Sequence, residues 1–135
     1  MTDRVFFYGT LMTGFDRRRR AGIDPILERV GRGRITAALF DLGIYPAAVP
    51  DPDGVVWGEV YRALDIDRVL VGLDEIEGHS PAMPEVSLYN RQEVPVTYED
   101  GTTEDAWVYF YNAPLGRAER IPSGDYFEHL RGTSQ

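Results

Sequence analysis

The chain has 135 residues, no cysteine and a formal net charge of −8, from 14 basic and 22 acidic residues. This length predicts a single domain spanning residues 1–135, and a hydrophobic fraction of 43% is typical of globular proteins. The lack of cysteine excludes disulfides and cysteine nucleophiles, and the acidic balance argues against a nucleic-acid partner. All the basic residues are arginine, which excludes lysine Schiff-base chemistry and a P-loop lysine.

The sequence also argues against membrane insertion and secretion. No apolar run approaches the roughly 20 residues that a membrane-spanning helix needs. The N-terminal MTDRVFF lacks the basic segment, apolar stretch and cleavage site of a signal peptide. We therefore expect a cytoplasmic protein with no membrane partner. Nothing in the sequence indicates an oligomeric state.

The chain up to residue 64 is predicted to be mainly strands. RVFFY, residues 4–8, predicts a first strand because apolar and aromatic residues dominate it. RITAALFDLG (34–43) and VVWGEVYRAL (55–64) predict two more strands for the same reason. Three prolines and a closing Asp-Gly in YPAAVPDPDG (45–54) predict an ordered loop between those two strands.

A helix is expected within residues 15–30, broken or started at Pro25. This segment contains DRRRR, Asp16 to Arg20. The run is compatible with a phosphate or nucleic-acid patch, or with the solvent-exposed face of the helix. The acidic balance of the whole chain favours the exposed face.

The second half of the chain is predicted to contain a helix, two strands and a last helix, in that order. A helix is predicted at about 66–77, and a short last helix near PSGDYFEHL, with Ser123 as its N-cap. Two strand-like segments, 88–98 and 105–112, flank EDGTTE, which indicates a hairpin with Pro95 at an edge or bulge. Because strands dominate without regular βαβ alternation, we expect an α+β fold, a small mixed β-barrel flanked by helices.

Glu77 occupies an unusual place in the helix at 66–77. Ile66, Leu70, Leu73 and Glu77 recur at helical spacing and share one face, so the acid lies in line with leucines, while Asp74 is expected at the surface. Gly78 is typical of a helix C-terminus, where the macrodipole disfavours a negative charge. The helix end and burial would both raise the pKa of Glu77, as suits a group that takes and returns a proton.

A simpler interpretation of Glu77 remains open. Many helices end with an acid at the edge of the apolar face, and an arginine such as Arg91 could pair with it. The spacing alone does not separate this boundary acid from an inward-facing acid/base.

Seven segments occur in an order that resembles a known family. They are YGTL (8–11), LFDLGIYPAAVP (39–50), GEVYRAL (58–64), LDEIEG (73–78), YNRQEVPV (89–96), AWVYFY (106–111) and IPSGDY (121–126). Together they resemble the gamma-glutamylcyclotransferase-like family, in particular its AIG2-like and gamma-glutamylamine-cyclotransferase-like branch. The stretch HSPAMPEVS, 79–87, looks longer than in compact members, so that rim of the pocket is expected to differ.

The resemblance implies a small β-barrel flanked by helices, with a pocket at one side. It implies that the turn after the first strand lines this pocket, which maps onto Tyr8, Gly9, Thr10 and Leu11. It also implies that Glu77 is the catalytic acid/base. Members of the family cyclise a gamma-glutamyl group to 5-oxoproline, release the attached amine or amino acid, and need no metal or organic cofactor.

Three further tyrosines are candidates for the pocket wall. Tyr109 shares a strand face with Trp107 and Tyr111, a face that could equally pack in the core. Tyr45 and Tyr126 could close the pocket from other segments. The two histidines, His79 and His129, lack a metal-ligand spacing, so no metal site is assigned.

The sequence leaves three functional hypotheses. The first is a gamma-glutamyl cyclotransferase-like enzyme acting on a small gamma-glutamyl amine or peptide. The second is a non-catalytic module on the same fold that binds a small carboxylate or has a regulatory role. The third, an oligonucleotide-binding barrel, conflicts with the acidic charge.

Overall fold

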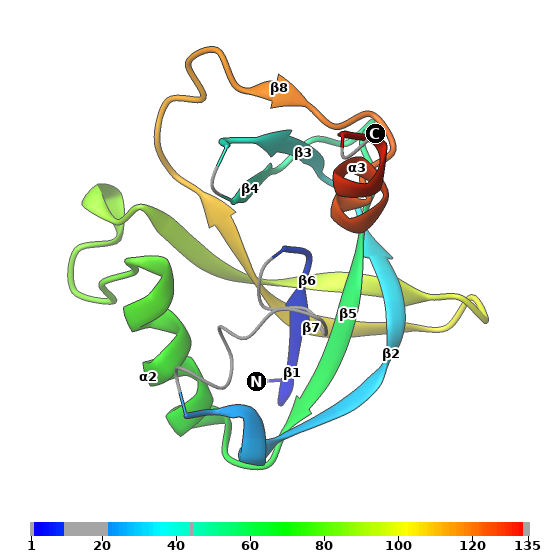
Figure 1. The fold of residues 1–135 in the computed structure, drawn as a ribbon. Coiled ribbons are helices and arrows are strands. Elements are labelled where there is room, and N and C mark those ends of the chain that lie inside the picture. The colour runs from blue at the N-terminus through cyan, green and yellow to red at the C-terminus, as the bar shows by residue number, and fades with distance from the viewer. Residues whose placement is uncertain (1, 10–21, 44, 134–135) are drawn as a thin grey trace.

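The structure, a computed structural model, describes residues 2–9, 22–43 and 45–133. Five strands form a closed barrel in the order β1 (Arg4–Phe7), β5 (Val56–Ala63), β2 (Leu27–Ile35), β6 (Tyr89–Tyr98) and β7 (Thr103–Tyr111) (Figure 1). Neighbouring strands are antiparallel, except that β1 and β7 close the barrel in parallel. The expected α+β fold with a small mixed barrel is confirmed.

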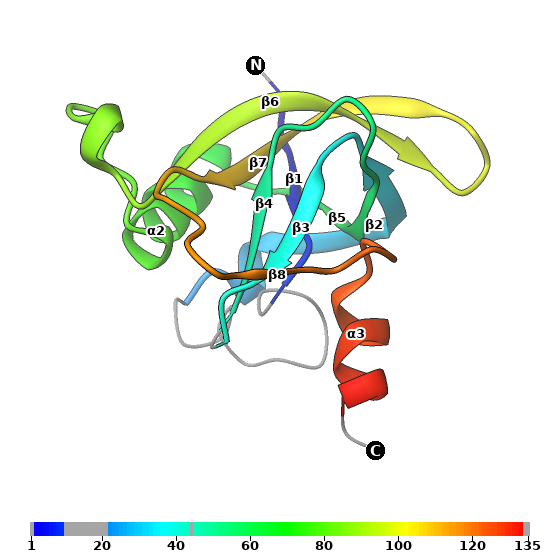
Figure 2. The same ribbon diagram turned by 90° about the horizontal axis from the view of Figure 1, so that it is seen from above.

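A second, three-stranded sheet lies beside the barrel, in the order β4 (Pro46–Val49), β3 (Ala38–Asp41) and β8 (Glu119–Arg120). Helix α2 (Ile66–Glu77) and helix α3 (Tyr126–Thr133) lie on different sides of the molecule (Figures 1 and 2). Two 3₁₀ turns, η1 (Asp24–Ile26) and η2 (Pro84–Val86), precede β2 and β6. No helix in the described part of the chain has the length and apolar character needed to cross a bilayer.

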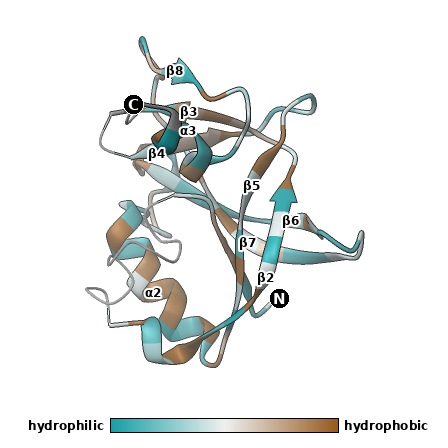
Figure 3. Cartoon of the chain, turned by 45° about the vertical axis from the view of Figure 1, so that its right-hand side comes forward, coloured by the Kyte–Doolittle hydropathy of each residue, from teal (hydrophilic) through white to brown (hydrophobic). Residues whose placement is uncertain are grey.

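The core fills the barrel and the space under α2 and the small sheet. Its most buried large side chains are Phe6, Leu39, Leu73, Ile121, Val5, Val56, Val60, Val69, Val96 and Val108. The β6–β7 turn, by contrast, projects away from the core and is hydrophilic (Figure 3). The hairpin is the predicted one, with strands β6 and β7 on either side of the polar turn in EDGTTE. Pro95 lies where β6 pairs with β7 but not with β2, so it occupies an edge, as predicted.

Two predictions for the chain before residue 44 are wrong. Residues 24–26 form η1, and Leu27 begins β2, so the described end of the 15–30 segment is not an α-helix. Pro25 opens that turn, and the strand that follows pairs with β5 over its whole length, which outweighs local propensity. The predicted strand 34–43 is divided between β2 and β3, which belong to different sheets. The run Asp16 to Arg20 lies outside the described residues.

The predicted loop 45–54 contains strand β4, which pairs with β3. Pro46 is tolerated in β4 because it is the first residue of the strand, where a missing N–H costs little. The predicted cap of the last helix is also displaced. Asp125, not Ser123, accepts from the Glu128 N–H at 3.1 Å, and Ser123 instead accepts from the Asp125 N–H.

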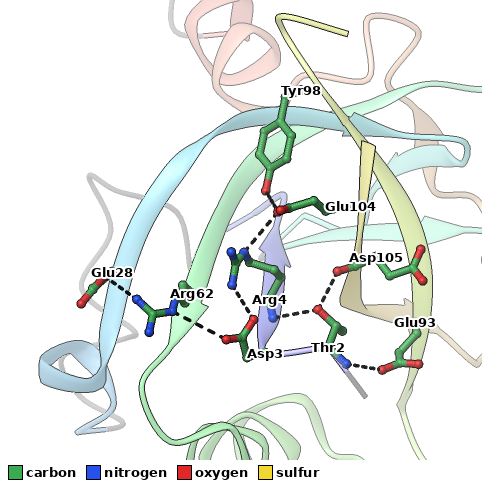
Figure 4. Close-up of polar contacts among 9 residues, drawn as sticks. All are labelled: Thr2, Asp3, Arg4, Glu28, Arg62, Glu93, Tyr98, Glu104 and Asp105. Atoms are coloured by element: carbon green, nitrogen blue, oxygen red, sulfur yellow. Dashed lines mark hydrogen bonds and ion pairs between the residues drawn. The ribbon is translucent and has the colours of Figure 1, made fainter. Parts of the chain in front are cut away.

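Polar contacts close the seam between β1 and β7, where only Val5 and Trp107 are paired (Figure 4). The Arg4 guanidinium contacts Asp3 and, at 3.2 Å, Glu104 of β7. The Tyr98 hydroxyl donates to the same Glu104 carboxylate at 2.7 Å, and burial together with this bond raises the pKa of Tyr98 to about 12. These contacts hold the short N-terminal strand in register at the point where the barrel closes.

Close packing between β1 and β5 yields a test of the barrel. A Cβ at Gly58 would lie 2.2 Å from the Phe7 carbonyl oxygen and 2.7 Å from Phe6 Cζ, whereas one at Gly31 would meet only Tyr98 Cδ1 at 3.9 Å. We expect Gly58→Ala to lower the free energy of unfolding by about 1–3 kcal/mol, because backbone must move to admit the methyl group. Gly31→Ala is the control and should be neutral or slightly stabilising. Equal effects of the two substitutions in denaturant unfolding would contradict the packing described.

Candidate active site

Helix α2 carries the principal candidate, Glu77, at its last residue. Asp65 caps the helix by accepting from the Arg68 N–H at 3.3 Å, and Gly78 ends it in the left-handed region with φ of 65°. Both the predicted span 66–77 and the glycine stop are confirmed. The buried face consists of Val69, Leu70, Leu73 and Asp74. Glu77 itself is half-buried.

Glu77 borders a cavity at the junction of α2, the end of β1 and the start of β4. The cavity holds about 540 Å³ of empty space, including its opening to solvent. Its wall contains most of the predicted pocket residues, namely Tyr8, Gly9, Tyr45, Glu77 and Tyr109. The remaining described wall residues are Phe6, Phe7, Pro46, Ile76, Leu88 and Tyr89. Thr10 and Leu11 lie outside the described residues, and Tyr126 is buried away from this wall.

Gly9 allows two backbone segments to meet at the cavity. A Cβ at this position would lie 2.6 Å from Pro46 Cγ and 3.0 Å from Pro46 Cδ. The end of β1 and the start of β4 can therefore approach this closely only if residue 9 has no side chain.

The Tyr8 side chain joins three strands behind the cavity. Its hydroxyl donates to the Tyr109 carbonyl at 2.7 Å and accepts from the Ala48 N–H at 3.3 Å. Burial raises the pKa of Tyr8 well above its usual value, and the negative charge of Glu77 acts in the same direction. Tyr8 is therefore a neutral phenol whose proton is already donated to the backbone.

Two carboxylates, Asp74 and Glu77, affect the Tyr109 hydroxyl. This hydroxyl donates to Asp74 Oδ1. Burial, the hydrogen bond to Asp74 and the charge of Asp74 raise the pKa of Tyr109, and the Glu77 charge adds to the effect. Of the three aromatic residues predicted to share this strand face, Trp107, Tyr109 and Tyr111, only Tyr109 is among the described wall residues. Tyr111 instead packs against Tyr89, with ring centroids 5.2 Å apart.

Asp74 is a buried residue, which corrects its expected surface position. Only 9% of it is exposed, and Arg91 Nε lies 3.0 Å from its Oδ1. The ion pair suggested as one alternative for Glu77 and Arg91 is thus found between Arg91 and Asp74. The helical spacing could have predicted that Asp74 is buried, because Asp74 follows Leu70 by one turn and lies on the same buried face of the helix.

The histidines and acids form no metal centre among the described residues, in which no cluster of three or more potential ligands occurs. His79 Nδ1 lies 3.2 Å from the Tyr89 carbonyl and 3.1 Å from Asn90 Oδ1. His129 Nε2 lies 2.8 Å from Asp41 Oδ2 at the other end of the molecule. Each imidazole therefore has a local structural partner.

Comparison with known proteins gives the family. The sequence profile described as "Gamma-glutamyl cyclotransferase, AIG2-like" matches residues 5–128. The chain belongs to this family. The match covers every described wall residue of the cavity.

Two relatives within the gamma-glutamyl cyclotransferase family match this chain at low identity, one over nearly the full length and one over two thirds. A candidate gamma-glutamylcyclotransferase of Methanocaldococcus jannaschii is 29% identical over 133 residues, 94% of this chain and 98% of that one. The gamma-glutamylcyclotransferase family protein YtfP of Escherichia coli is 36% identical over 91 residues, 67% of each chain.

Solved structures agree with the fold. The solution structure of Escherichia coli ytfP superposes with a TM-score of 0.64 at 31% identity, covering 94% of this chain and 98% of that one. An AIG2-like protein from Mus musculus superposes with a TM-score of 0.69 at 21% identity, covering 92% and 87%. The barrel with its flanking helices is therefore the family fold.

The hydrogen bonds of Tyr8 yield a test of how the cavity wall is held. Tyr8→Phe removes the link from β1 to β4 and β7 and leaves the buried Ala48 N–H without this acceptor. We expect the free energy of unfolding to fall by about 1–3 kcal/mol. Tyr45→Phe, on the same wall but half-buried, is the control and should change stability by less than about 0.5 kcal/mol. A Tyr8→Phe protein as stable as the control in denaturant unfolding would show that the link is not formed.

Proposed function

We propose that this protein cyclises a small gamma-glutamyl amine or peptide to 5-oxoproline and releases the amine, with Glu77 as general acid/base. The proposal is supported chiefly by the position of Glu77, which ends α2 on the wall of a cavity shared with Gly9. Family membership supports the same class of reaction. The identity of the substrate and the role of each residue are part of this proposal.

The reaction suits a site with one carboxylate and an enclosed wall. The substrate's α-amine attacks its own γ-carbonyl, so a five-membered ring forms and the bond to the leaving nitrogen breaks. Because the step is intramolecular, much of the acceleration comes from holding the folded conformer. The aromatic wall of Phe6, Tyr8, Tyr89 and Tyr109 has the shape and rigidity for that purpose.

Proton transfer accounts for the role of Glu77. The α-ammonium nitrogen carries three protons in the substrate and one as the lactam nitrogen, so it loses two. The leaving nitrogen carries one proton as an amide and three as a released ammonium, so it gains two. Glu77 takes protons from the attacking nitrogen and returns them to the departing one, with no net uptake. No water is consumed in this reaction.

The end of β1 supplies the complementary polar group. In our proposal, the Gly9 backbone N–H binds either the substrate carboxylate or the oxygen that becomes negative during ring closure. A well-placed donor of this kind contributes roughly 3–4 kcal/mol to transition-state stabilisation in comparable sites. Tyr8, Tyr45 and Tyr109 complete the substrate-binding wall.

Replacement of Glu77 tests the proposal directly. We expect Glu77→Gln to lower kcat for 5-oxoproline formation by at least about 100-fold, because the amide is nearly isosteric but cannot carry the proton. Release of 5-oxoproline from a panel of gamma-glutamyl amines and dipeptides, followed by mass spectrometry, measures the effect. The matched control is Glu75→Gln, an exposed acid on the same helix, which should retain wild-type turnover.

Two results would count against the proposal. Unchanged turnover in Glu77→Gln would remove Glu77 from the mechanism. A wild-type protein that is stabilised by 5-oxoproline or glutamate in a thermal shift, yet converts no gamma-glutamyl compound, would favour the non-catalytic binding module.

A further inference from the structure

A buried carboxylate next to the proposed catalytic residue is not used by the mechanism above. Asp74 lies on α2 one turn before Glu77 and is 9% exposed. Its Oδ1 accepts from Arg91 Nε at 3.0 Å and from the Tyr109 hydroxyl. Arg91 and Tyr109 are directly opposed partners on β6 and β7. A single carboxylate oxygen thus joins α2 to a cross-strand pair of the barrel.

The backbone of Asp74 fixes the same helix end. Its carbonyl accepts from the Gly78 N–H, and from the His79 N–H at 2.9 Å. These two bonds close the last turn of α2, which carries Glu77. The turn lies against the end of the β6–β7 hairpin that is away from its tip (Figures 1 and 2). Side chain and backbone of Asp74 together determine where Glu77 sits against the cavity.

The hydrogen bond to Asp74 also determines whether the Tyr109 hydroxyl can donate or accept a hydrogen bond with a ligand. A phenol has one proton, and Tyr109 donates it to Asp74. The raised pKa of Tyr109 keeps that proton in place at neutral pH. Toward a ligand in the cavity, the Tyr109 oxygen therefore acts as an acceptor and suits an N–H donor rather than a carboxylate.

We propose that Asp74 is a positioning residue. It holds the turn that bears Glu77, and it binds the Tyr109 proton so that the Tyr109 oxygen accepts a hydrogen bond from the substrate's α-amine. The inference rests on the proposed cyclisation. It adds Asp74 to the site and gives Tyr109, already in the substrate-binding wall, the role of orienting the attacking nitrogen toward Glu77.

The barrel offers a matched control for this arrangement. Glu59 is also 9% exposed, accepts from the Tyr61 hydroxyl at 3.1 Å and lies 3.7 Å from Arg29. Glu59 and Tyr61 are not among the described residues of the cavity wall. Glu59→Gln and Tyr61→Phe therefore remove a buried acid and a buried hydroxyl of the same kind at positions outside the described cavity wall, and Tyr61→Phe keeps the ring that packs against Phe7.

The experiment compares kcat/KM for the best gamma-glutamyl substrate across these variants. We expect Asp74→Asn and Tyr109→Phe each to lower kcat/KM by up to about 100-fold. The double variant, Asp74→Asn with Tyr109→Phe, should have the same kcat/KM as the less active of the two single variants, because Asp74 acts on the substrate amine through Tyr109. Asp74→Asn also removes the charge that Arg91 pairs with, so Tyr109→Phe, which keeps that ion pair, is the decisive variant if the first one folds poorly. Glu59→Gln and Tyr61→Phe should keep wild-type values.

The pH profile separates positioning from a loss of folded protein. The charged and titratable groups around Glu77 and Asp74 among the described residues are Tyr8, Tyr45, His79, Tyr89, Arg91 and Tyr109. Asp74→Asn removes a negative charge one helical turn from Glu77, and this change favours the charged form of the Glu77 carboxylate. The acidic limb of kcat/KM should therefore move to lower pH in Asp74→Asn and stay in place in Glu59→Gln.

The experiment separates a failure of the positioning role from a failure of the proposed function. Wild-type protein that converts no gamma-glutamyl compound overturns both the function and this inference. Wild-type turnover with unchanged kcat/KM in Tyr109→Phe overturns the inference alone. An acidic limb that does not move in a folded Asp74→Asn protein also overturns it.

Discussion

The geometry of the candidate site depends on the contacts that the Asp74 carboxylate makes with Arg91 and Tyr109. A buried charge is costly unless it is paired and hydrogen-bonded. Asp74 meets this requirement only where Arg91 and the Tyr109 hydroxyl converge on its Oδ1. Moving α2 by one residue along its axis would turn Asp74 by about 100° and leave the charge unpaired. The ion pair therefore selects one register of helix against barrel, and Glu77, one turn further on, follows that register.

The cavity forms because three chain segments meet without filling the space between them. Gly9 lets β1 end against Pro46, and the hydroxyls of Tyr8 and Tyr89 tie the wall to backbone carbonyls of Tyr109 and Pro46. Each of these hydroxyls donates to the protein, as Tyr109 does to Asp74. Three of the four tyrosines on the described wall thus donate their hydroxyl protons within the protein and have none left for a ligand. A wall with so few hydroxyl donors around one carboxylate suits a substrate that binds through an ammonium group.

Sequence patterns predicted helix α2 and the β6–β7 hairpin better than strands β2 and β4. The helix at 66–77, its glycine stop and the hairpin around EDGTTE follow from local rules of capping, spacing and turn composition, and all three were predicted. The strands β2 and β4 were missed or misplaced. Each depends on a partner strand distant in sequence, β5 for β2 and β3 for β4, and on tolerating glycine or proline that local propensity disfavours. Asp74 was misplaced because its burial depends on Arg91 and Tyr109, which follow it by 17 and 35 residues.

By itself, the sequence determined a small acidic α+β barrel, an acid in line with the leucines of one helix, and a glycine at the end of the first strand. These properties follow from composition, helical period and the lack of a side chain, which act over a few residues. Only the tertiary structure decided that Glu77 and Gly9 share a cavity, that Arg91 pairs with Asp74, and that Tyr109 donates its proton to the same carboxylate. These contacts join α2, β1, β6 and β7, and their geometry exists only once the barrel has closed, because no local rule relates residues so far apart in the chain.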